Sequence, residues 1–286
     1  MPELPEVETV RRGLEKRLLN FQIKELEVCR DKSIASPGGS QIFIEKMRGT
    51  SIGSWKRRGK YLFSSLYKRL DNQSHIDWGW WAVHLRMTGH FQWHEKPISP
   101  CNHTRVRFWD QNGIELRFVD MRSFGQMWWV PPESQPAKIV TGLKKLGPEP
   151  FSNEFNYDYL KSCLKKRSRS IKASLLDQSL VAGVGNIYAD ETLFAAGIVP
   201  YKESSKLSKN EINKICQKLK EILQKSIKEG GTTFSDFRDL EGLNGNYGDK
   251  AWVYRRSNKP CRKCGTIIKK LKLIGRGTHW CPNCQK

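Results

Sequence analysis

The first three residues, Met1-Pro2-Glu3, combine an amine that can become a nucleophile with a carboxylate. Removal of Met1 would leave Pro2 as a free secondary amine next to Glu3. An α-amino group has a reference pKa near ~8, against ~10.4 for lysine, so far more of it is neutral and nucleophilic at pH 7. Attack of such an amine on a sugar aldehyde carbon produces an iminium ion, which is a strong electron sink. Taken alone, these residues are equally compatible with an ordinary helix start.

Four clustered cysteines near the other end of the chain indicate a metal site. Cys261-x-x-Cys264 and Cys281-x-x-Cys284 are separated by sixteen residues, a spacing typical of a zinc ion held by four thiolates. Redox-active thiols are the less favoured alternative. Residues 251–286 contain ten Lys or Arg and no Asp or Glu, which favours a DNA-contacting zinc hairpin with Arg276 at its tip.

The charge balance narrows the class of partner. The 286 residues include 50 Lys or Arg and 29 Asp or Glu, a formal net charge of +21. Such an excess suits a polyanion, although ribosomal and membrane-surface proteins share it. No run approaches ~18 consecutive apolar residues, and the N-terminus lacks a signal-peptide pattern. We therefore expect a cytoplasmic protein without a membrane segment.

The order of the expected elements predicts an N-terminal β-structure followed by a helical part. Val7, Val10, Leu14 and Leu18 have helical spacing, and from about residue 21 to 130 the pattern changes to short β-like runs. Asn112-Gly113 is a signal for a two-residue hairpin turn, and the region predicts an antiparallel sandwich or barrel. Residues 131–150 hold five of the 13 prolines and predict a linker. The clearest predicted strands are 60–67, 80–85, 104–109 and 114–119, and the predicted later helices are 157–164, 171–178, 189–196 and 209–229.

Three further groups of residues have the types needed to act on DNA. Lys60 ends the basic run 56–60 directly before a predicted strand, where it could serve as a general acid or phosphate anchor rather than lie on a solvated face. Asn186 follows a glycine-containing turn that could present N–H groups to a phosphate. Met87, Arg122 and Phe124 offer an apolar wedge with an arginine, as needed to fill the space that a flipped base leaves, although Met and Phe are more often core residues.

Several long motifs in this order resemble the bacterial formamidopyrimidine-DNA glycosylase (8-oxoguanine DNA glycosylase) family, from Pro2 to Gln285. The motifs are Pro2-Glu3-Leu-Pro-Glu6-Val-Glu-Thr, Arg58-Gly-Lys60-Tyr, His84-Leu-Arg-Met87-Thr-Gly, Asp120-Met-Arg122-Ser-Phe124-Gly, Leu176-Asp-Gln-Ser-Leu-Val-Ala-Gly-Val-Gly-Asn186-Ile-Tyr-Ala-Asp-Glu and Gly275-Arg276-Gly-Thr-His-Trp-Cys-Pro-Asn-Cys284-Gln.

The resemblance implies an α+β fold of two domains with a structural zinc ion. Residues 1–130 would form a β-sandwich with an N-terminal helix, 131–150 a linker, 151–250 a helix–two-turns–helix domain with a loop over the lesion, and 251–286 a zinc β-hairpin finger. The ion would be bound by Cys261, Cys264, Cys281 and Cys284, and four thiolates would leave no position for a catalytic water.

The resemblance also implies a bifunctional glycosylase and abasic-site lyase that removes oxidised purines from damaged double-stranded DNA. The catalytic residues would be Pro2 as the Schiff-base nucleophile, Glu3 as proton donor to the opening sugar, Lys60 as proton donor for β-elimination and Arg276 for δ-elimination. Met87, Arg122 and Phe124 would fill the vacated stack, with Arg122 facing the orphaned cytosine, and Asn186 would bind phosphate with Lys60 and Arg276. His103 is a weaker DNA contact. The enzyme would be a monomer, associated with the nucleoid.

Two departures from the family pattern and two alternatives remain at this stage. Arg255 stands where the family typically has glycine, and Ser235-Asp236-Phe237, in the loop expected over the lesion, differs from the usual form.

The sister enzyme endonuclease VIII, which acts on oxidised pyrimidines, is the nearest alternative, but Leu4 and the Arg122-Ser-Phe124 segment favour the purine enzyme. The other alternative is a DNA-binding protein that has lost catalysis, which the presence of every expected catalytic residue disfavours.

Overall fold

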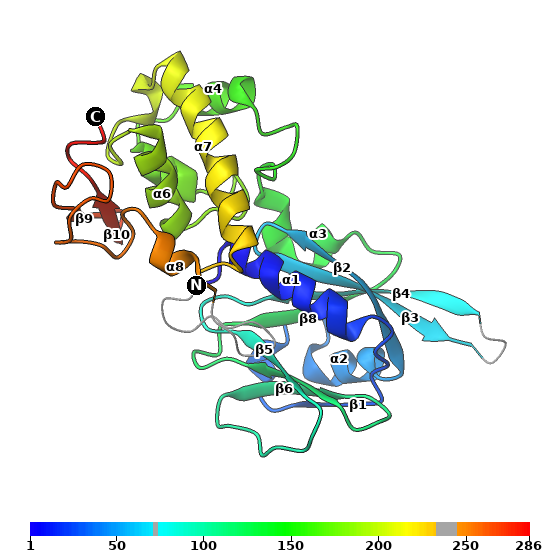
Figure 1. Ribbon diagram of the computed structural model, residues 1–286. Helices are drawn as coiled ribbons and strands as arrows, with labels where there is room; N and C mark the ends of the chain where they lie inside the picture. Colours follow the sequence, from blue (N-terminus) through cyan, green and yellow to red (C-terminus); the bar gives the residue numbers. More distant parts are fainter. Residues whose placement is uncertain (71–73, 233–244) are drawn as a thin grey trace. The chain divides into compact units, whose positions relative to one another are not determined.

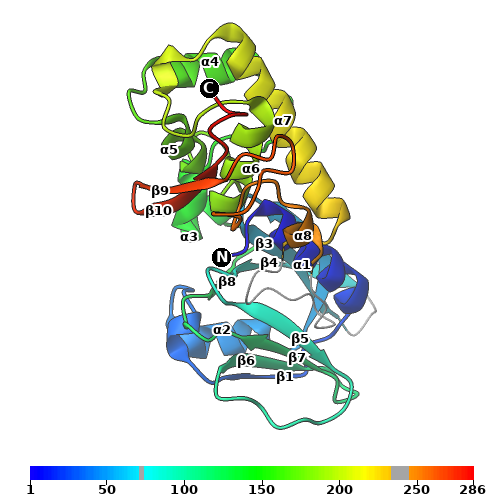
Figure 2. The ribbon, with the colours of Figure 1, turned by 60° about the vertical axis from the view of Figure 1, so that its left-hand side comes forward.

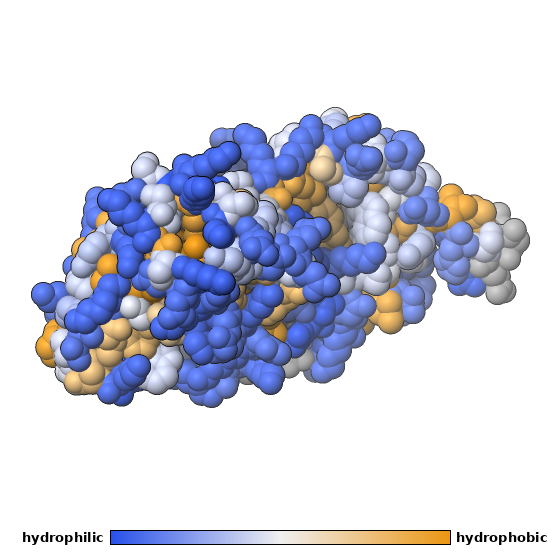
Figure 3. Space-filling model, turned by 90° about the horizontal axis from the view of Figure 1, so that it is seen from above, coloured by the Kyte–Doolittle hydropathy of each residue, from blue (hydrophilic) through white to orange (hydrophobic). Residues whose placement is uncertain are grey.

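The computed structural model describes residues 1–70, 74–232 and 245–286, and it divides into two units (Figures 1 and 2). The first unit contains Met1–Lys144 and Gly230–Gly245, and the second contains Lys145–Glu229 and Asn246–Lys286. Hydrophilic residues dominate the face in Figure 3, as the excess of Lys and Arg leads one to expect. Within the described ranges, no helix has both the length and the apolar character needed to cross a bilayer.

Among the described residues of the first unit, the β-structure consists of two four-stranded antiparallel sheets. In spatial order, the strands are β2 (Thr50–Arg58), β3 (Tyr61–Arg69), β4 (His75–His84) and β8 (Gln126–Val130) in the first sheet, and β1 (Glu25–Val28), β6 (Thr104–Trp109), β7 (Glu115–Val119) and β5 (His90–His94) in the second. Each predicted strand corresponds to one of these, so the β-sandwich prediction is confirmed.

The core of the first unit lies between the sheets and receives side chains from α1 (Leu4–Leu18) and α2 (Gly39–Met47). Helix α1 buries the four apolar residues whose spacing predicted it, and it packs beside β2 (Figure 1). Trp81 of the first sheet and Phe108 of the second are fully buried and have their ring centroids 4.7 Å apart. The two sheets are therefore joined by direct aromatic packing.

Two local expectations in this unit were wrong. Helix α2 lies in a region predicted to be β-structure; it starts after Gly38, whose φ is +81°, and buries Phe43 and Met47. The β6–β7 turn is also longer than two residues, because the Asp110 N–H donates to the Ile114 carbonyl at 3.1 Å. The Asp110 carboxylate accepts the N–H groups of Asn112 and Ile114, each at 2.8 Å, and this stabilises the longer turn.

The proline-rich interval 131–150 contains two short helical segments, α3 (Pro136–Ile139) and η2 (Thr141–Lys145), and the boundary at Lys144 between the units. Val140 is buried, and a Cβ atom added at Gly142 would lie 2.1 Å from the Tyr61 hydroxyl oxygen. The first part of this interval therefore packs closely within the first unit.

The second unit is helical and carries a small β-hairpin. Its longest helix, α7, starts with a capping box in which the Glu211 N–H donates to Ser208 Oγ and the Ser208 N–H donates to Glu211 Oε2. Helix α7 packs against α4 and α6. The elements of this unit are α4 (Tyr157–Lys165), α5 (Ile171–Leu176), α6 (Asn186–Ala196), η3 (Ser204–Lys206), α7 (Lys209–Lys228), α8 (Tyr247–Lys250), β9 (Lys269–Leu273) and β10 (Arg276–Trp280). The described part of the first unit also contains η1 (Asp31–Ser33).

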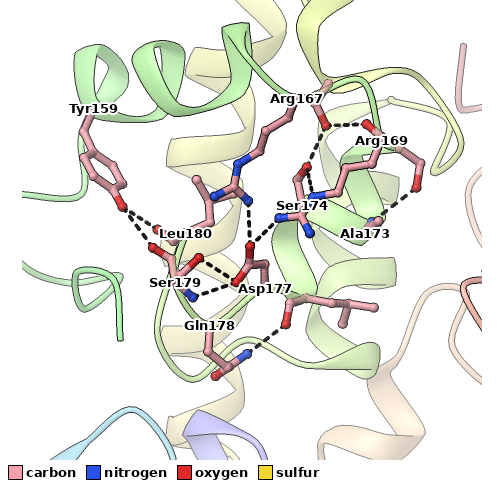
Figure 4. A network of polar contacts seen from close by, with 12 residues as sticks. Tyr159, Arg167, Arg169, Ala173, Ser174, Asp177, Gln178, Ser179 and Leu180 are labelled. Atoms are coloured by element: carbon pink, nitrogen blue, oxygen red, sulfur yellow. Dashed lines mark hydrogen bonds and ion pairs between the residues drawn. The ribbon is translucent and has the colours of Figure 1, made fainter. Parts of the chain in front are cut away.

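The turn between α5 and α6 is organised around Asp177 (Figure 4). The Asp177 carboxylate accepts hydrogen bonds from Arg167 at 3.0 Å, from Arg169, and from the backbone N–H and hydroxyl of Ser179 at 2.9 and 2.7 Å. Burial alone would raise the pKa of this carboxyl, but the bonds from Ser179 and Arg169 outweigh it and hold the pKa well below its usual range. Asp177 is the C-cap residue of α5, so this helix ends at Leu176, two residues before its predicted end at Gln178.

Replacing Asp177 with Asn is expected to lower the free energy of unfolding by about 2 kcal/mol at neutral pH, because hydrogen bonds to a charged group contribute roughly 1.5–3 kcal/mol. The pKa of Asp177 is depressed in the folded state, so the stabilisation is present above the ordinary aspartate pKa and is lost as the pH falls below it. Denaturant unfolding of both proteins at about pH 7 and about pH 3 measures this difference. Equal stabilities at neutral pH would contradict the role given to Asp177.

Candidate functional site

The N-terminus of α1 carries two buried carboxylates. Glu3 is the N-cap residue and is 3% exposed, and its backbone N–H donates to Glu6 Oε2 at 2.8 Å. The other oxygen of Glu6 accepts the backbone N–H of Thr232 at 2.8 Å. Pro2 is also buried, whereas Met1 is 53% exposed. The second and third residues of the chain are therefore held in place, while the first remains accessible.

Three loops of the first unit emerge at one end of its first sheet. Tyr61, the first residue of β3, pairs with His84, the last of β4, and His84 pairs with Gln126, the first of β8. The turn containing Lys60, the loop 85–89 and the loop 120–125 are thus neighbours at this end of the sheet. We call this region the loop end.

Helix α1 brings its first residues toward the loop end. Glu8, near the helix start, forms an ion pair with Arg57 of β2 at 3.3 Å. Arg11, one turn later, donates to the carbonyl of Trp55, which lies earlier in β2, at 3.3 Å. Since β2 runs toward the loop end, the helix runs away from it, and its N-terminal residues lie there.

Lys60 occupies the two-residue turn between β2 and β3 and is 7% exposed. Gly59, before it, has a φ of +56°, a conformation that glycine adopts without strain. The neighbouring His84 is buried, and its Nδ1 accepts the backbone N–H of Arg86 at 2.9 Å. Burial, followed by the positive charges of Arg86 and Lys60, lowers the pKa of His84 to about 3. The imidazole beside Lys60 is therefore neutral at physiological pH.

Replacing His84 with Gln is expected to flatten the acid side of the stability profile. The pKa of His84 is depressed from 6.5 to about 3 in the folded state, so its contribution is complete above pH 6.5 and is lost as the pH falls toward 3. One such group changes stability by up to about 1.4 kcal/mol per pH unit in this window. Denaturant unfolding across the window tests this, and identical pH slopes for variant and wild type would contradict it.

Met87, Arg122 and Phe124 are brought together at the loop end, and we call them the insertion set. Arg122 Nη1 lies 2.9 Å from the Met87 sulfur, and its guanidinium carbon lies 4.8 Å from the centre of the Phe124 ring. Arg122 is exposed, and Phe124 is 49% exposed. Large apolar groups displayed with an arginine can enter a base stack. These three residues do not belong to the core, as a Met and a Phe more commonly would.

His103 is exposed and lies beside the loop 120–125. Its backbone carbonyl accepts the N–H of Asp120 at 2.9 Å, and its Nδ1 lies 3.4 Å from Arg105 Nη2. His103 is thus placed next to the loop that carries Arg122, by the pairing of β6 with β7.

In the second unit, Asn186 and the zinc hairpin are in direct contact. Asn186 is the first residue of α6, and its Nδ2 donates to the carbonyl of Gly277 at 3.0 Å. Gly277 follows Arg276, which is exposed at the start of β10. The hydrogen bond joins the start of α6 to the residue next to Arg276, so these two predicted site residues are brought together.

A fully buried ion pair, not anticipated from the sequence, supports the same hairpin. Lys172 of α5 and Asp190 of α6 are each 0% exposed, and their charged atoms lie 2.6 Å apart. Lys172 also donates to the Gly277 carbonyl at 3.1 Å and to Thr278 Oγ1 at 2.8 Å, while Asp190 accepts the backbone N–H of His279 at 2.9 Å. The pair therefore fixes the backbone that follows Arg276. Charged residues in predicted helices are usually solvated, and Lys172 was grouped with basic residues expected to supply charge near Asn186, so its burial against Asp190 was not predicted.

The four predicted metal ligands fit a zinc ion. The sulfur atoms of Cys261, Cys264, Cys281 and Cys284 all lie within 4.8 Å of one another. The Cys261–Cys284 and Cys264–Cys281 separations are 3.9 and 3.5 Å. Tetrahedral zinc with Zn–S bonds of about 2.3 Å requires sulfur atoms roughly 3.8 Å apart. Four thiolates complete such a site, so the chemistry that the ion supplies is structural.

Gln285, which was not among the predicted site residues, anchors this finger. It is 1% exposed; its Oε1 accepts the Cys281 N–H at 2.9 Å and its Nε2 donates to the Ile198 carbonyl at 2.7 Å. The residue after the last cysteine therefore connects the finger to the segment after α6.

The two departures from the family pattern have different outcomes. Arg255 has a φ of +57°, in the left-handed region that favours glycine, which gives a physical reason for the glycine usual at this position. Ser235-Asp236-Phe237, of the loop expected over the lesion, lies outside the described residues.

Three family models match the chain in order. The formamidopyrimidine-DNA glycosylase N-terminal domain matches residues 1–127, the formamidopyrimidine-DNA glycosylase H2TH domain matches 146–238, and a zinc finger found in FPG and IleRS matches 258–286. A formamidopyrimidine-DNA glycosylase of Prochlorococcus marinus (strain MIT 9211) is 63% identical over 285 residues, covering 100% of both chains.

Two solved structures of Lactococcus lactis Fpg have the same fold. A complex with DNA containing an abasic site has a TM-score of 0.87 and 34% identity and covers 99% of each chain. A complex of an Fpg mutant with DNA containing Fapy-dG has a TM-score of 0.88 and 34% identity and covers 100% of each chain. The α+β prediction, with its sandwich, helical and zinc-finger parts, is confirmed by these matches and by the elements described above.

Proposed function

Because this chain belongs to the formamidopyrimidine-DNA glycosylase family, we propose that it excises oxidised purines from damaged duplex DNA and then cleaves the strand as an abasic-site lyase. The substrates are 8-oxoguanine and formamidopyrimidines, and the enzyme acts as a monomer on chromosomal DNA in the cytoplasm. Its functional division is a catalytic sandwich (1–130), a linker (131–150), a helical DNA-binding domain (151–250) and a zinc finger (251–286).

The observation that carries the proposal is the gathering of three kinds of group at the loop end. The start of α1 supplies Pro2 and Glu3, the β2–β3 turn supplies Lys60, and two further loops supply the insertion set. A nucleophile, proton donors and a wedge for the base stack are what excision from a duplex needs.

Base release begins at the sugar of the damaged nucleotide. Once Met1 is removed, the nitrogen of Pro2 attacks C1′, the C1′–base bond breaks, and the base leaves with a proton. Glu3 donates a proton to O4′ in the same step, so the sugar ring opens as the base departs and an iminium ion joins Pro2 to C1′. Glu3 is held for this role because its backbone is the N-cap of α1 and its side chain is buried.

Strand cleavage follows from the acidity of the iminium ion. Loss of the C2′ proton expels the 3′ phosphate, with Lys60 as proton donor, and a second elimination expels the 5′ phosphate, assisted by Arg276. Water then hydrolyses the remaining bond to Pro2 and regenerates the amine. Lys60 is suited to this task because its turn at the loop end restricts its position and because His84 beside it is neutral.

The insertion set and the second unit bind the DNA around the reacting sugar. Met87 and Phe124 fill the space left by the flipped nucleotide, and Arg122 faces the orphaned cytosine. His103, beside the Arg122 loop, contacts the same strand region. Asn186 and Arg276 bind phosphates, and the zinc ion, when bound, maintains the hairpin that carries Arg276.

A comparison of two lesions tests this assignment. Duplexes with one 8-oxoguanine opposite cytosine or one thymine glycol opposite adenine are incubated with the protein, and released bases and strand breaks are quantified. Faster release of 8-oxoguanine supports the proposal. A preference for thymine glycol would favour the endonuclease VIII alternative, and binding without any release would favour a protein that has lost catalysis.

Binding to lesion DNA is expected to weaken steeply with salt. The logarithm of the association constant should fall with the logarithm of salt concentration, with a slope near −0.9 for each phosphate neutralised. Replacing Arg276 with Ala should make the slope less negative by about one. Fluorescence anisotropy over a salt series measures both values, and a flat response would contradict phosphate binding by this basic chain.

A further inference from the structure

We propose that Asp120 and Thr88 are positioning residues that fix the insertion set in its DNA-ready arrangement. This inference rests on the proposed function, because it concerns how that function's wedge is held before DNA binds. Neither residue belongs to the insertion set, and both are buried beneath it.

The carboxylate of Asp120 holds the loop that carries two members of the set. Asp120 is 0% exposed; its Oδ1 accepts the backbone N–H of Arg122 at 3.2 Å, and its Oδ2 accepts that of Gly125 at 2.6 Å. The Ser123 N–H also donates to the Asp120 carbonyl at 3.3 Å. The four residues after Asp120 include both Arg122 and Phe124, so one buried carboxyl group determines the path of this loop.

The hydroxyl of Thr88 joins that loop to the loop of the third member. Thr88 Oγ1 donates to Asp120 Oδ1 and accepts the backbone N–H of Arg122 at 3.0 Å. Thr88 directly follows Met87. The Thr88 hydroxyl and the Asp120 carboxylate together therefore set the position of the Met87 backbone relative to the Arg122 backbone.

Both loops also lie on one buried aromatic ring. Cβ atoms added at Gly89 and Gly125 would lie 2.7 and 2.5 Å from Phe118 Cζ, so only glycine permits each loop to approach the ring this closely. Phe118 itself is fully buried. Both loops therefore pack on the same ring, and the Thr88–Asp120 hydrogen bond joins them directly.

The backbone of these loops needs such restraint. Arg86 has a φ of +55° and Ser123 a φ of +53°, and residues other than glycine rarely adopt this backbone conformation. They persist when surrounding contacts enforce them. A set that is ordered before it meets DNA loses less conformational entropy on insertion than a mobile one. Loss of the Thr88–Asp120 pair should therefore impair insertion while leaving Pro2, Glu3 and Lys60 able to react.

The test separates insertion from chemistry by the choice of substrate. Thr88→Val and Asp120→Asn are compared with wild type on duplex 8-oxoguanine opposite cytosine and on an abasic site in a single strand, which has no stack to invade. We expect kcat/KM for the duplex to fall by about tenfold or more, as loss of a buried hydrogen bond that leaves its partner unsatisfied implies. Lyase cleavage of the single strand should change by less than about twofold.

Two further variants provide the controls. Thr88→Ser keeps the hydroxyl and should restore the duplex rate to near the wild-type value. Asp110→Asn removes a carboxylate that also accepts two backbone N–H groups, from Asn112 and Ile114, but in the β6–β7 turn. It should leave both rates unchanged.

The possible results give distinct conclusions. Duplex rates that stay at the wild-type value in Thr88→Val and Asp120→Asn would overturn the inference, as would an equal loss on both substrates, which indicates general misfolding. A selective duplex defect rescued by Thr88→Ser supports it. A wild-type protein that cannot excise the lesion would instead refute the proposed function on which the inference rests.

Discussion

Replacing Glu3 with Gln is expected to lower the rate of 8-oxoguanine excision by at least about 100-fold, the lower range for loss of a general acid. Glutamine occupies the same volume but cannot donate a proton to the opening sugar. The fold should be retained, because the backbone N–H of residue 3 still donates to Glu6 Oε2, and the side-chain oxygen of glutamine can still accept the Glu6 backbone N–H in the capping box of α1. Single-turnover release of the base from a duplex measures the effect.

Binding gives the internal control for this variant. Affinity for a duplex with a stable abasic-site analogue should stay within about threefold of wild type, because no binding role is given to the Glu3 carboxylate. Glu45→Gln, at an exposed ion-paired glutamate of α2, should keep full activity. If Glu3→Gln excises at the wild-type rate, Glu3 is not the proton donor.

Replacing Cys281 with Ser is expected to remove the metal and abolish tight DNA binding. Cys281 is 0% exposed and lies 3.5 Å, sulfur to sulfur, from Cys264, so a serine hydroxyl would leave a defective buried ligand set. Binding of structural zinc provides roughly 10–16 kcal/mol to small finger modules, and the hairpin that carries Arg276 should lose its order with the ion. Affinity for lesion DNA should fall at least about tenfold.

Elemental analysis and anisotropy give the two readouts for this variant. We expect one zinc per wild-type chain and none per Cys281→Ser chain. Cys29→Ser, at an exposed free cysteine, should keep both metal and affinity. A Cys281→Ser protein that retains one equivalent of zinc would contradict the four-thiolate site.

Features determined by local spacing could be predicted from the sequence. The apolar period of residues 7–18 predicted α1, alternating residues predicted the strands, and the paired cysteines predicted a metal site whose sulfur atoms lie together. The residues of the insertion set were found through residue type and motif, and the structure brings them into contact. In each case, the prediction rests on residue types and spacings that can be read from the sequence, without knowledge of contacts between distant segments.

Features that depend on distant contacts could not be predicted in this way. Helix α2 was missed because its short apolar pattern resembles that of a buried strand, and only packing of Phe43 and Met47 in the core distinguishes them. Lys172 and Asp190 lie in different predicted helices, each near other charged residues, and their roles depend on a hairpin about one hundred residues from Lys172. The hydrogen bond from the Thr88 hydroxyl to the Asp120 carboxylate likewise joins two loops that are distant in the sequence.

Borohydride trapping is the most direct test of the central claim, that the nitrogen of Pro2 forms a Schiff base with damaged DNA. The purified protein, with removal of Met1 verified by intact mass, is incubated with duplex DNA containing one 8-oxoguanine opposite cytosine in the presence of borohydride. The adduct is then digested and mapped by mass spectrometry. We predict a covalent adduct on Pro2. The absence of an adduct, or an adduct on a lysine such as Lys60, from a protein with a free Pro2 terminus would contradict the claim.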